Sequence, residues 1–156
     1  MLEFDYKLDY KKLSFRKSEN RKLYRIGRGE QGVLLVRPYT NVICRLWRFR
    51  TPEIAEKSAR RIYYLYMRFR ALRDFIGMDM CRKFLEMGFT RARRYANHKN
   101  GKKYKDGKIL PQENDWATNE KAKAASIFKI FRDKVTKDPK YQSMRADWRE
   151  LENVSN

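Results

Sequence analysis

The sequence is poor in the residues from which most metal and disulfide sites are built. It has a single histidine, His98, and two cysteines, Cys44 and Cys81, which lie far apart and form no C-x-x-C pair. One histidine cannot supply a histidine-rich metal site, and two distant thiols indicate neither a zinc site nor a disulfide framework. We therefore expect two free thiols in the core, no metal and no cofactor.

Long hydrophobic stretches are also missing. The longest run of aliphatic residues, Val33–Val36, has four members, and the first ten residues, MLEFDYKLDY, lack the apolar segment of a signal peptide. A membrane helix needs about 20 mostly apolar residues. The sequence therefore predicts no membrane span and no membrane partner, and we expect a reduced, intracellular protein of the cytoplasm.

Acidic residues are scarce beside the basic ones. The chain of 156 residues has 38 Lys and Arg against 19 Asp and Glu, a net charge of +19. The excess is local, because residues 37–108 hold 20 basic and 6 acidic side chains, whereas residues 109–156 hold nine and eight. Such a concentration of charge indicates a surface for a polyanion, and the 14% of aromatic residues argue for a folded chain.

The order of predicted elements gives a mostly helical α+β fold in one domain, 1–156. Residues 1–23 are expected to form an N-terminal arm. Residues 24–50 are expected to form a small β element, in which YRI and VLLV flank the turn GRGEQG and VICRLWRFR (42–50) adds a third strand. A bundle of four to five helices should follow.

Capping residues and glycines set the predicted helix ends. Thr51-Pro52-Glu53 is a typical helix start, so the basic helices (51–98) should begin there and the first should run to about Arg73. Gly77 and Gly88 are expected to separate this helix from further ones at 78–87 and 91–97. A basic loop or small hairpin (99–115) with an Asp106-Gly107 turn comes next, and then a C-terminal helical pair (116–152) whose second member starts at Asp138-Pro139.

The helix predicted over 53–73 is basic on one face and apolar on the other. At 100° per residue, Ala55, Ala59 and Ile62 fall opposite a row of cations, and no acidic residue occurs between Glu56 and Asp74. Guanidinium and ammonium groups in a row suit a phosphate backbone, and a tyrosine among them can stack on a base. The predicted nucleic-acid contacts of this helix are Lys57, Arg60, Arg61, Tyr64 and Arg68. An ordinary solvated helix face is the alternative.

A second basic cluster occupies TRARRYANHKNGKKYKDGK, residues 90–108. Dense cations interleaved with aromatic residues are typical of nucleic-acid binding, whereas a mobile, solvated lysine loop is the plainer interpretation. The predicted contacts here are Arg91, Arg93, Arg94, His98, Lys99, Lys102, Lys103, Tyr104, Lys105 and Lys108.

Gly27, Gly29 and Gly32 spell G-x-G-x-x-G. In a dinucleotide site this motif precedes a helix, but here the predicted strand VLLV follows it, so we expect a glycine turn. Backbone amides of such a turn, beside arginines, can still meet a phosphate. The residues that would do so are Arg25, Gly27, Arg28 and Gly29.

Signals of catalysis are weak. No G-x-S-x-G elbow or credible triad occurs. Asp74, Asp79 and Glu86 could hold a metal in a nuclease-like site, but helix caps and ion pairs also explain such acids. The sequence therefore favours a protein that is not an enzyme.

Three blocks of the chain carry a resemblance to a known family: YRIGRGEQGVLLVRPY (24–39), WRFRTPEIAEKSA (47–59) and DFIGMDMCRKFLEMGFTRARRYANHKNGKKY (74–104). They resemble a family of domains of unknown function that is associated with tailed phages, bacteria and some fungi. The resemblance covers about two thirds of the chain. It implies a shared fold and a phage as one source, and it carries over no activity and no site residues.

These observations together predict a non-catalytic protein that binds DNA or RNA through phosphate contacts of its basic helix and loop. A protein-interaction factor for an acidic host or assembly partner is the first alternative, and a metal-dependent nuclease is the second. The oligomeric state is left open.

Overall fold

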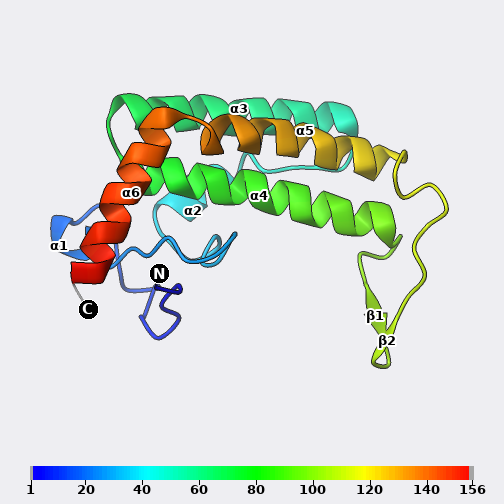
Figure 1. The fold of residues 1–156 in the computed structure, drawn as a ribbon, viewed down its shortest axis with the longest axis horizontal. Coiled ribbons are helices and arrows are strands. Elements are labelled where there is room, and N and C mark those ends of the chain that lie inside the picture. Colours follow the sequence, from blue (N-terminus) through cyan, green and yellow to red (C-terminus); the bar gives the residue numbers. More distant parts are fainter. Residues whose placement is uncertain (1, 155–156) are drawn as a thin grey trace.

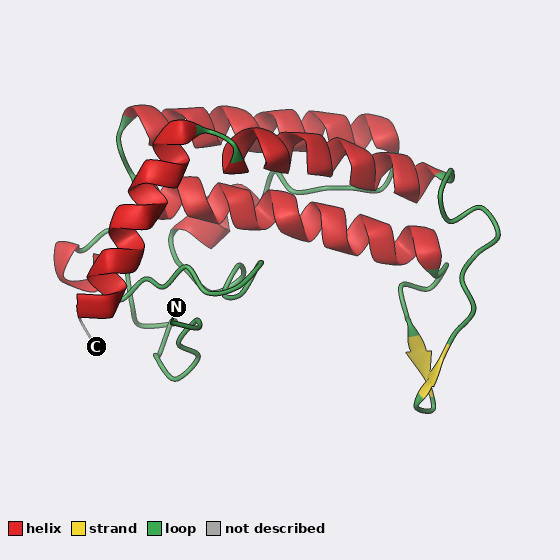
Figure 2. Ribbon diagram, viewed as in Figure 1, coloured by secondary structure: helices red, strands yellow, loops and turns green. Residues whose placement is uncertain are grey.

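Three long helices lie side by side and form the body of the protein, and the second of them along the chain runs antiparallel to the first and the third (Figure 1). The computed structural model describes residues 2–154. Over these residues the elements are α1 (Ser18–Arg21), α2 (Tyr39–Cys44), α3 (Pro52–Ala71), α4 (Phe75–Asn97), β1 (Tyr104–Lys105), β2 (Lys108–Ile109), α5 (Glu120–Thr136) and α6 (Pro139–Val154). Helices α3, α4 and α5 make the body, and α6 crosses one end of it (Figure 2). The mostly helical fold is confirmed.

The β element predicted over 24–50 is wrong. Residues 24–27 are irregular and residues 28–38 form successive turns, in which Val33 N–H donates to the Glu30 carbonyl and Leu35 N–H to the Gly32 carbonyl. The next segment is the short helix α2, with Tyr39, Thr40 and Ile43 buried at helical spacing. Val33 and Val36 are buried as core residues of an irregular segment, so their apolar character reflects packing and not strand pairing.

Helix α4 runs without a break through both glycines that were expected to end helices. A Cβ at Gly77 would lie 2.4 Å from the Phe69 ring, and one at Gly88 would lie 2.4 Å from the Phe128 ring. Each glycine therefore lets a phenylalanine of a neighbouring helix approach the α4 backbone closely. The predicted helix ends at Gly77 and Gly88 are wrong, and both positions are sites of close helix packing.

Local start and turn signals are confirmed. The Thr51 hydroxyl accepts a hydrogen bond from Ile54 N–H at 3.2 Å and caps α3, and α6 begins at Pro139 as predicted. The Asp106-Gly107 turn joins β1 to β2, with positive φ at both residues. This is the sheet of the described chain, so the strands lie in the middle of the sequence and not before the helices.

The core is centred on α4. Its residues 75–85 are all buried, and aromatic side chains of the irregular N-terminal arm, Phe4, Tyr10 and Phe15, join the same core. Both cysteines are free, Cys81 buried and Cys44 half-buried. Within residues 2–154, no helix combines the length and apolarity that crossing a membrane requires.

Candidate nucleic-acid interface

The outer face of α3 carries the first predicted row of cations. Lys57, Arg61 and Arg68 are exposed, and none of them forms an ion pair within residues 2–154. Tyr64 lies among them with 72% of its surface exposed. The buried face of the helix is opposite, as the helical spacing indicates. The row is therefore available to a ligand.

Arg60 has a different environment from the rest of the row. Its Nη2 lies 2.9 Å from Glu56 Oε1, and its guanidinium lies 5.7 Å from the centre of the Phe131 ring on α5. This places Arg60 on the α5 side of α3 with its charge largely compensated. It is the member of the predicted set on this helix that has a carboxylate partner, and its contact with nucleic acid stays a prediction.

Two arginines that sequence reasoning did not select extend the row. Arg45 and Arg48, in the segment between α2 and α3, line a hollow of about 250 Å³ together with Lys57 and Arg61 of α3. The segment is fixed to α3 because Ser58 Oγ accepts from Arg48 N–H at 2.9 Å and donates to the Leu46 carbonyl at 2.6 Å. In the sequence, only the high local density of basic residues pointed to Arg45 and Arg48. We call the following set the α3 patch: Arg45, Arg48, Lys57, Arg61, Tyr64 and Arg68.

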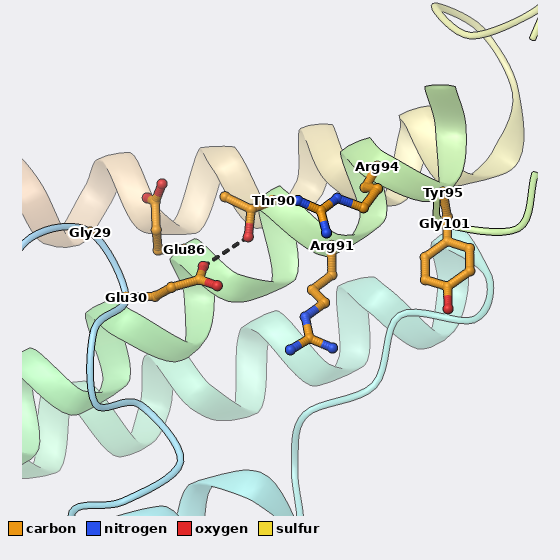
Figure 3. A pocket seen from close by; sticks show the side chains of 8 residues that line it. All are labelled: Gly29, Glu30, Glu86, Thr90, Arg91, Arg94, Tyr95 and Gly101. Carbon is orange, nitrogen blue, oxygen red and sulfur yellow. Dashed lines mark hydrogen bonds between the residues drawn. The ribbon is translucent and has the colours of Figure 1, made fainter. Parts of the chain in front are cut away.

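The C-terminal half of α4 presents Arg91 and Arg94 at a pocket of about 560 Å³ (Figure 3). Both arginines are exposed, and neither forms an ion pair with another residue of 2–154. The pocket also has two carboxylates, but each already has a partner. Glu30 accepts from Thr90 Oγ1 at 2.8 Å, and Glu86 pairs with Arg132 at 3.0 Å.

Arg93 and His98 do not belong to this surface. Arg93 donates to Asn97 Oδ1 at 3.1 Å and to the Trp116 carbonyl, with its guanidinium 5.7 Å from the centre of the Trp116 ring. His98 is only 7% exposed, and its Nδ1 has no hydrogen-bond partner among residues 2–154. The segment before α5 covers this side of α4, where Asn119 Nδ2 donates to the Ala96 carbonyl at 2.8 Å. Both residues have packing or hydrogen-bonding roles within the fold, and their predicted contacts with nucleic acid stay predictions.

The hairpin β1–β2 projects from the bundle at the C-terminal end of α4 (Figure 1). Its side chains are exposed, and Tyr104 is flanked by lysines, with Lys103 Nζ 5.6 Å from the ring centre. We call the exposed members of the second predicted cluster the hairpin patch: Arg91, Arg94, Lys99, Lys102, Lys103, Tyr104, Lys105 and Lys108.

The segment between α2 and α3 also connects the two patches. The Phe49 ring centre lies 5.9 Å from that of Tyr95 on α4, and Lys121 Nζ sits within 6 Å of both rings. Lys121 also donates to the Arg50 carbonyl at 2.8 Å. The start of α3, the end of α4 and the hairpin consequently gather at one end of the molecule (Figure 1).

The glycine turn is held by cations beneath it. Arg82 donates to the Gly29 carbonyl, Lys83 Nζ to the Gln31 carbonyl at 2.7 Å, and Arg149 to the Gly27 carbonyl at 2.9 Å. All three glycines of the motif have positive φ, as expected of a glycine turn. Of the predicted phosphate contacts here, Arg25 is half-buried, and exposed Arg28 lies 3.6 Å from Glu3.

A buried carboxylate balances these cations. Asp79 is fully buried, and its oxygens accept from Arg82 Nε at 3.0 Å, from the Tyr141 hydroxyl at 2.6 Å and from the Tyr24 hydroxyl. Burial alone would raise the pKa of Asp79, but Arg82, Lys83 and the two phenols lower it below its usual value. Burial lowers the pKa of Lys83 to about 7 despite the attraction of Asp79.

The three acids considered for a nuclease-like site lie in separate interactions. Asp74 Oδ1 is 2.7 Å from Arg21 and caps α4, Asp79 sits in the buried network, and Glu86 pairs with Arg132 on α5. Within residues 2–154 no three His, Cys, Asp or Glu side chains are close enough together to hold a metal ion. Each carboxylate is explained by a cap or an ion pair.

Comparison with known proteins gives a family and no relatives of known function. The family model Domain of unknown function (DUF4385) matches residues 5–151, which agrees with the resemblance seen in the sequence. No curated protein and no solved structure matches the chain.

Proposed function

Because the chain belongs to the family Domain of unknown function (DUF4385), its role has to be argued from its own surface, and we propose that it binds nucleic acid without catalysis. The observation that carries the proposal is a set of exposed cations that have no carboxylate partner within residues 2–154, Lys57, Arg61, Arg68, Arg91 and Arg94. Cations that serve a fold usually end on a carboxylate or a carbonyl group. These five end in solvent, where a phosphate can meet them.

The spacing along α3 suits a phosphate backbone. Lys57 and Arg61 are about 6 Å apart along the helix axis, and Arg68 lies about 10 Å further on. Long side chains on such a row reach successive phosphates, while exposed Tyr64 and Tyr104 offer rings on which unpaired bases can stack. Phosphate contacts and stacking are tolerant of sequence, so we expect low sequence specificity.

The dependence of affinity on salt tests this proposal. Fluorescein-labelled 20-mers of single- and double-stranded DNA and RNA are titrated with the full chain by fluorescence anisotropy at several salt concentrations. If about six phosphates are neutralised, log K should fall with log[salt] with a slope of about −5 for duplex DNA. A slope shallower than about −2 would contradict an extended phosphate interface.

An acidic protein is the competing ligand of the same surface, because carboxylates on a partner would meet the same cations. Affinity capture from a cell extract, with and without nuclease treatment, separates the two. The informative partners are those that remain after nuclease digestion and are lost when the α3 patch is neutralised. Such partners would identify an acidic protein, and not nucleic acid, as the ligand of this surface.

A further inference from the structure

A second cavity borders the glycine turn, and Gly29 lines both this cavity and the pocket beside Arg91 and Arg94, which we call the α4 pocket. The second cavity has a volume of about 540 Å³ and is bounded by the turn at Gly27–Gly29, by the junction of α5 and α6, and by the buried Arg82. It contains none of the residues of the α3 patch or the hairpin patch. Its volume lies within the range of small-molecule sites, about 300–1,000 Å³, and exceeds the needs of a single inorganic ion.

The charge around this cavity is of one sign. Arg28, Arg82 and Arg145 line it, and no carboxylate does. By contrast, the α4 pocket has Glu30 and Glu86 beside its two arginines. Arg82 is paired with Asp79, which fixes its guanidinium in place, and Arg28 lies 3.6 Å from Glu3, so the uncompensated charge of the lining comes from Arg145.

Arg145 provides the strongest single indication of a ligand. It is half-buried on α6, and its guanidinium has neither an ion-pair partner nor a hydrogen-bond partner within residues 2–154. By contrast, the guanidinium of Arg149, one turn further along the same helix, has partners within the fold. It pairs with Glu152 at 3.0 Å and donates to the Gly27 carbonyl. Partial burial of an unpaired cation is unfavourable, and an anion in the cavity would relieve it.

The glycine turn gives the cavity an opening. Gly27 and Gly29 have φ of 69° and 53°, the left-handed conformation found in turns whose backbone N–H groups converge on anions. A Cβ on Gly29 would meet no atom within 4 Å, so the turn is open at this residue. Thr136 and Gln142 border the same cavity from the α5–α6 junction.

We propose that this cavity binds a phosphate monoester of nucleotide size, with Arg145 and Arg28 on the phosphate and Arg82 at the base of the site. The positive charge of the lining favours an anion, and the volume of the cavity also accommodates the organic group of a phosphate monoester. The site is independent of the proposed nucleic-acid interface, because the two share no cation.

Isothermal titration calorimetry of the full chain tests the site with adenosine 5′-monophosphate, adenosine and inorganic phosphate as probes. The monophosphate should bind at least about tenfold more tightly than adenosine, the scale of one charge-assisted hydrogen bond. Arg145→Gln should remove most of this preference and Arg145→Lys should restore part of it. The matched controls Lys123→Gln and Arg16→Gln, which neutralise exposed cations outside both patches and outside the cavity, should leave it unchanged.

Equal binding of the monophosphate and adenosine, or an unchanged preference in Arg145→Gln, would overturn the proposal. A second arm compares 5′-phosphorylated with 5′-hydroxyl oligonucleotides. An Arg145-dependent preference for the phosphorylated strand assigns the site to a strand end, whereas its absence beside monophosphate binding assigns it to a free nucleotide. Loss of oligonucleotide binding in α3-patch variants is measured separately, so failure of either proposal is seen by itself.

Discussion

Two groups of cations in this protein have opposite surroundings. Arg82, Lys83 and Arg149 are buried or nearly so and donate to carbonyl groups of the glycine turn, whereas Lys57, Arg61 and Arg68 extend into solvent from α3. Both groups count equally in the net charge of +19. Only the second is free for a partner. The difference shows that a basic composition measures two things, the cations that hold the fold and those that can bind.

Asp79 is the carboxylate that compensates the buried cations Arg82 and Lys83, so a substitution of Asp79 should disrupt their interactions most. Asp79→Ala would leave Arg82 and Lys83 buried without their carboxylate, so we expect a loss of about 3–5 kcal/mol in the free energy of unfolding. Urea denaturation followed by circular dichroism measures it. Arg61→Gln, which removes an exposed cation, is the control and should change stability by less than about 0.5 kcal/mol. Similar losses of free energy of unfolding in both variants would show that the buried and the exposed cations do not differ in their contribution to stability.

The pH dependence of stability probes the buried group without a substitution. The pKa of Lys83 is about 7 in the folded protein, below its ordinary value of 10.5, so above pH 7 the unfolded chain binds more protons than the folded one. The free energy of unfolding should therefore rise from pH 7 towards pH 9, by at most about 1.4 kcal/mol per pH unit. Urea unfolding at pH 6, 7, 8 and 9 measures this. Stability that falls over the interval would show that Lys83 stays charged.

Neutralising the exposed group should affect binding and leave the fold intact. The triple variant Lys57→Gln, Arg61→Gln, Arg68→Gln should flatten the salt slope by about 3 and weaken binding by at least about tenfold at low salt. Anisotropy titrations against the wild type provide the measurement. A charge-matched triple variant, Lys11→Gln, Lys17→Gln, Lys123→Gln, removes exposed cations outside both patches and should have a much smaller effect. Equal effects would mean that net charge alone governs binding.

Arg93 tests whether the cations are correctly divided between those that hold the fold and those that can bind a partner. Sequence reasoning places it with Arg91 and Arg94, but its guanidinium is used by Asn97 and Trp116. Arg93→Gln should cost about 1–2 kcal/mol of stability through these lost hydrogen bonds and hardly change affinity for nucleic acid. Arg94→Gln should show the reverse pattern. Thermal unfolding and anisotropy on the same two variants decide between the assignments.

Features set by neighbouring residues could be read from the sequence. Thr51-Pro52 and Asp138-Pro139 favour helix starts through their own capping and backbone preferences, and Asp106-Gly107 makes its turn in the same local way. The exposed row on α3 follows equally from helical spacing.

Features set by distant residues could not. Gly88 looks like a helix end until the Phe128 ring, 40 positions away, is seen against it. Trp116 decides the role of Arg93 in the same way. The run VLLV resembles a strand because strands and irregular core segments share apolar residues, and only the structure shows that Val33 and Val36 enter the core from successive turns.

The hairpin between Lys103 and Leu110 has a consequence for handling the protein. Its strands have two residues each, and residues 102–109 are all exposed, so few interactions oppose its separation from the bundle. Local opening there should occur without global unfolding, which makes its lysines the first sites that trypsin cuts and its amides among the fastest to exchange with deuterium. The Asp106-Gly107 tip is accordingly the place where a fluorophore or an inserted tag would disturb the core least.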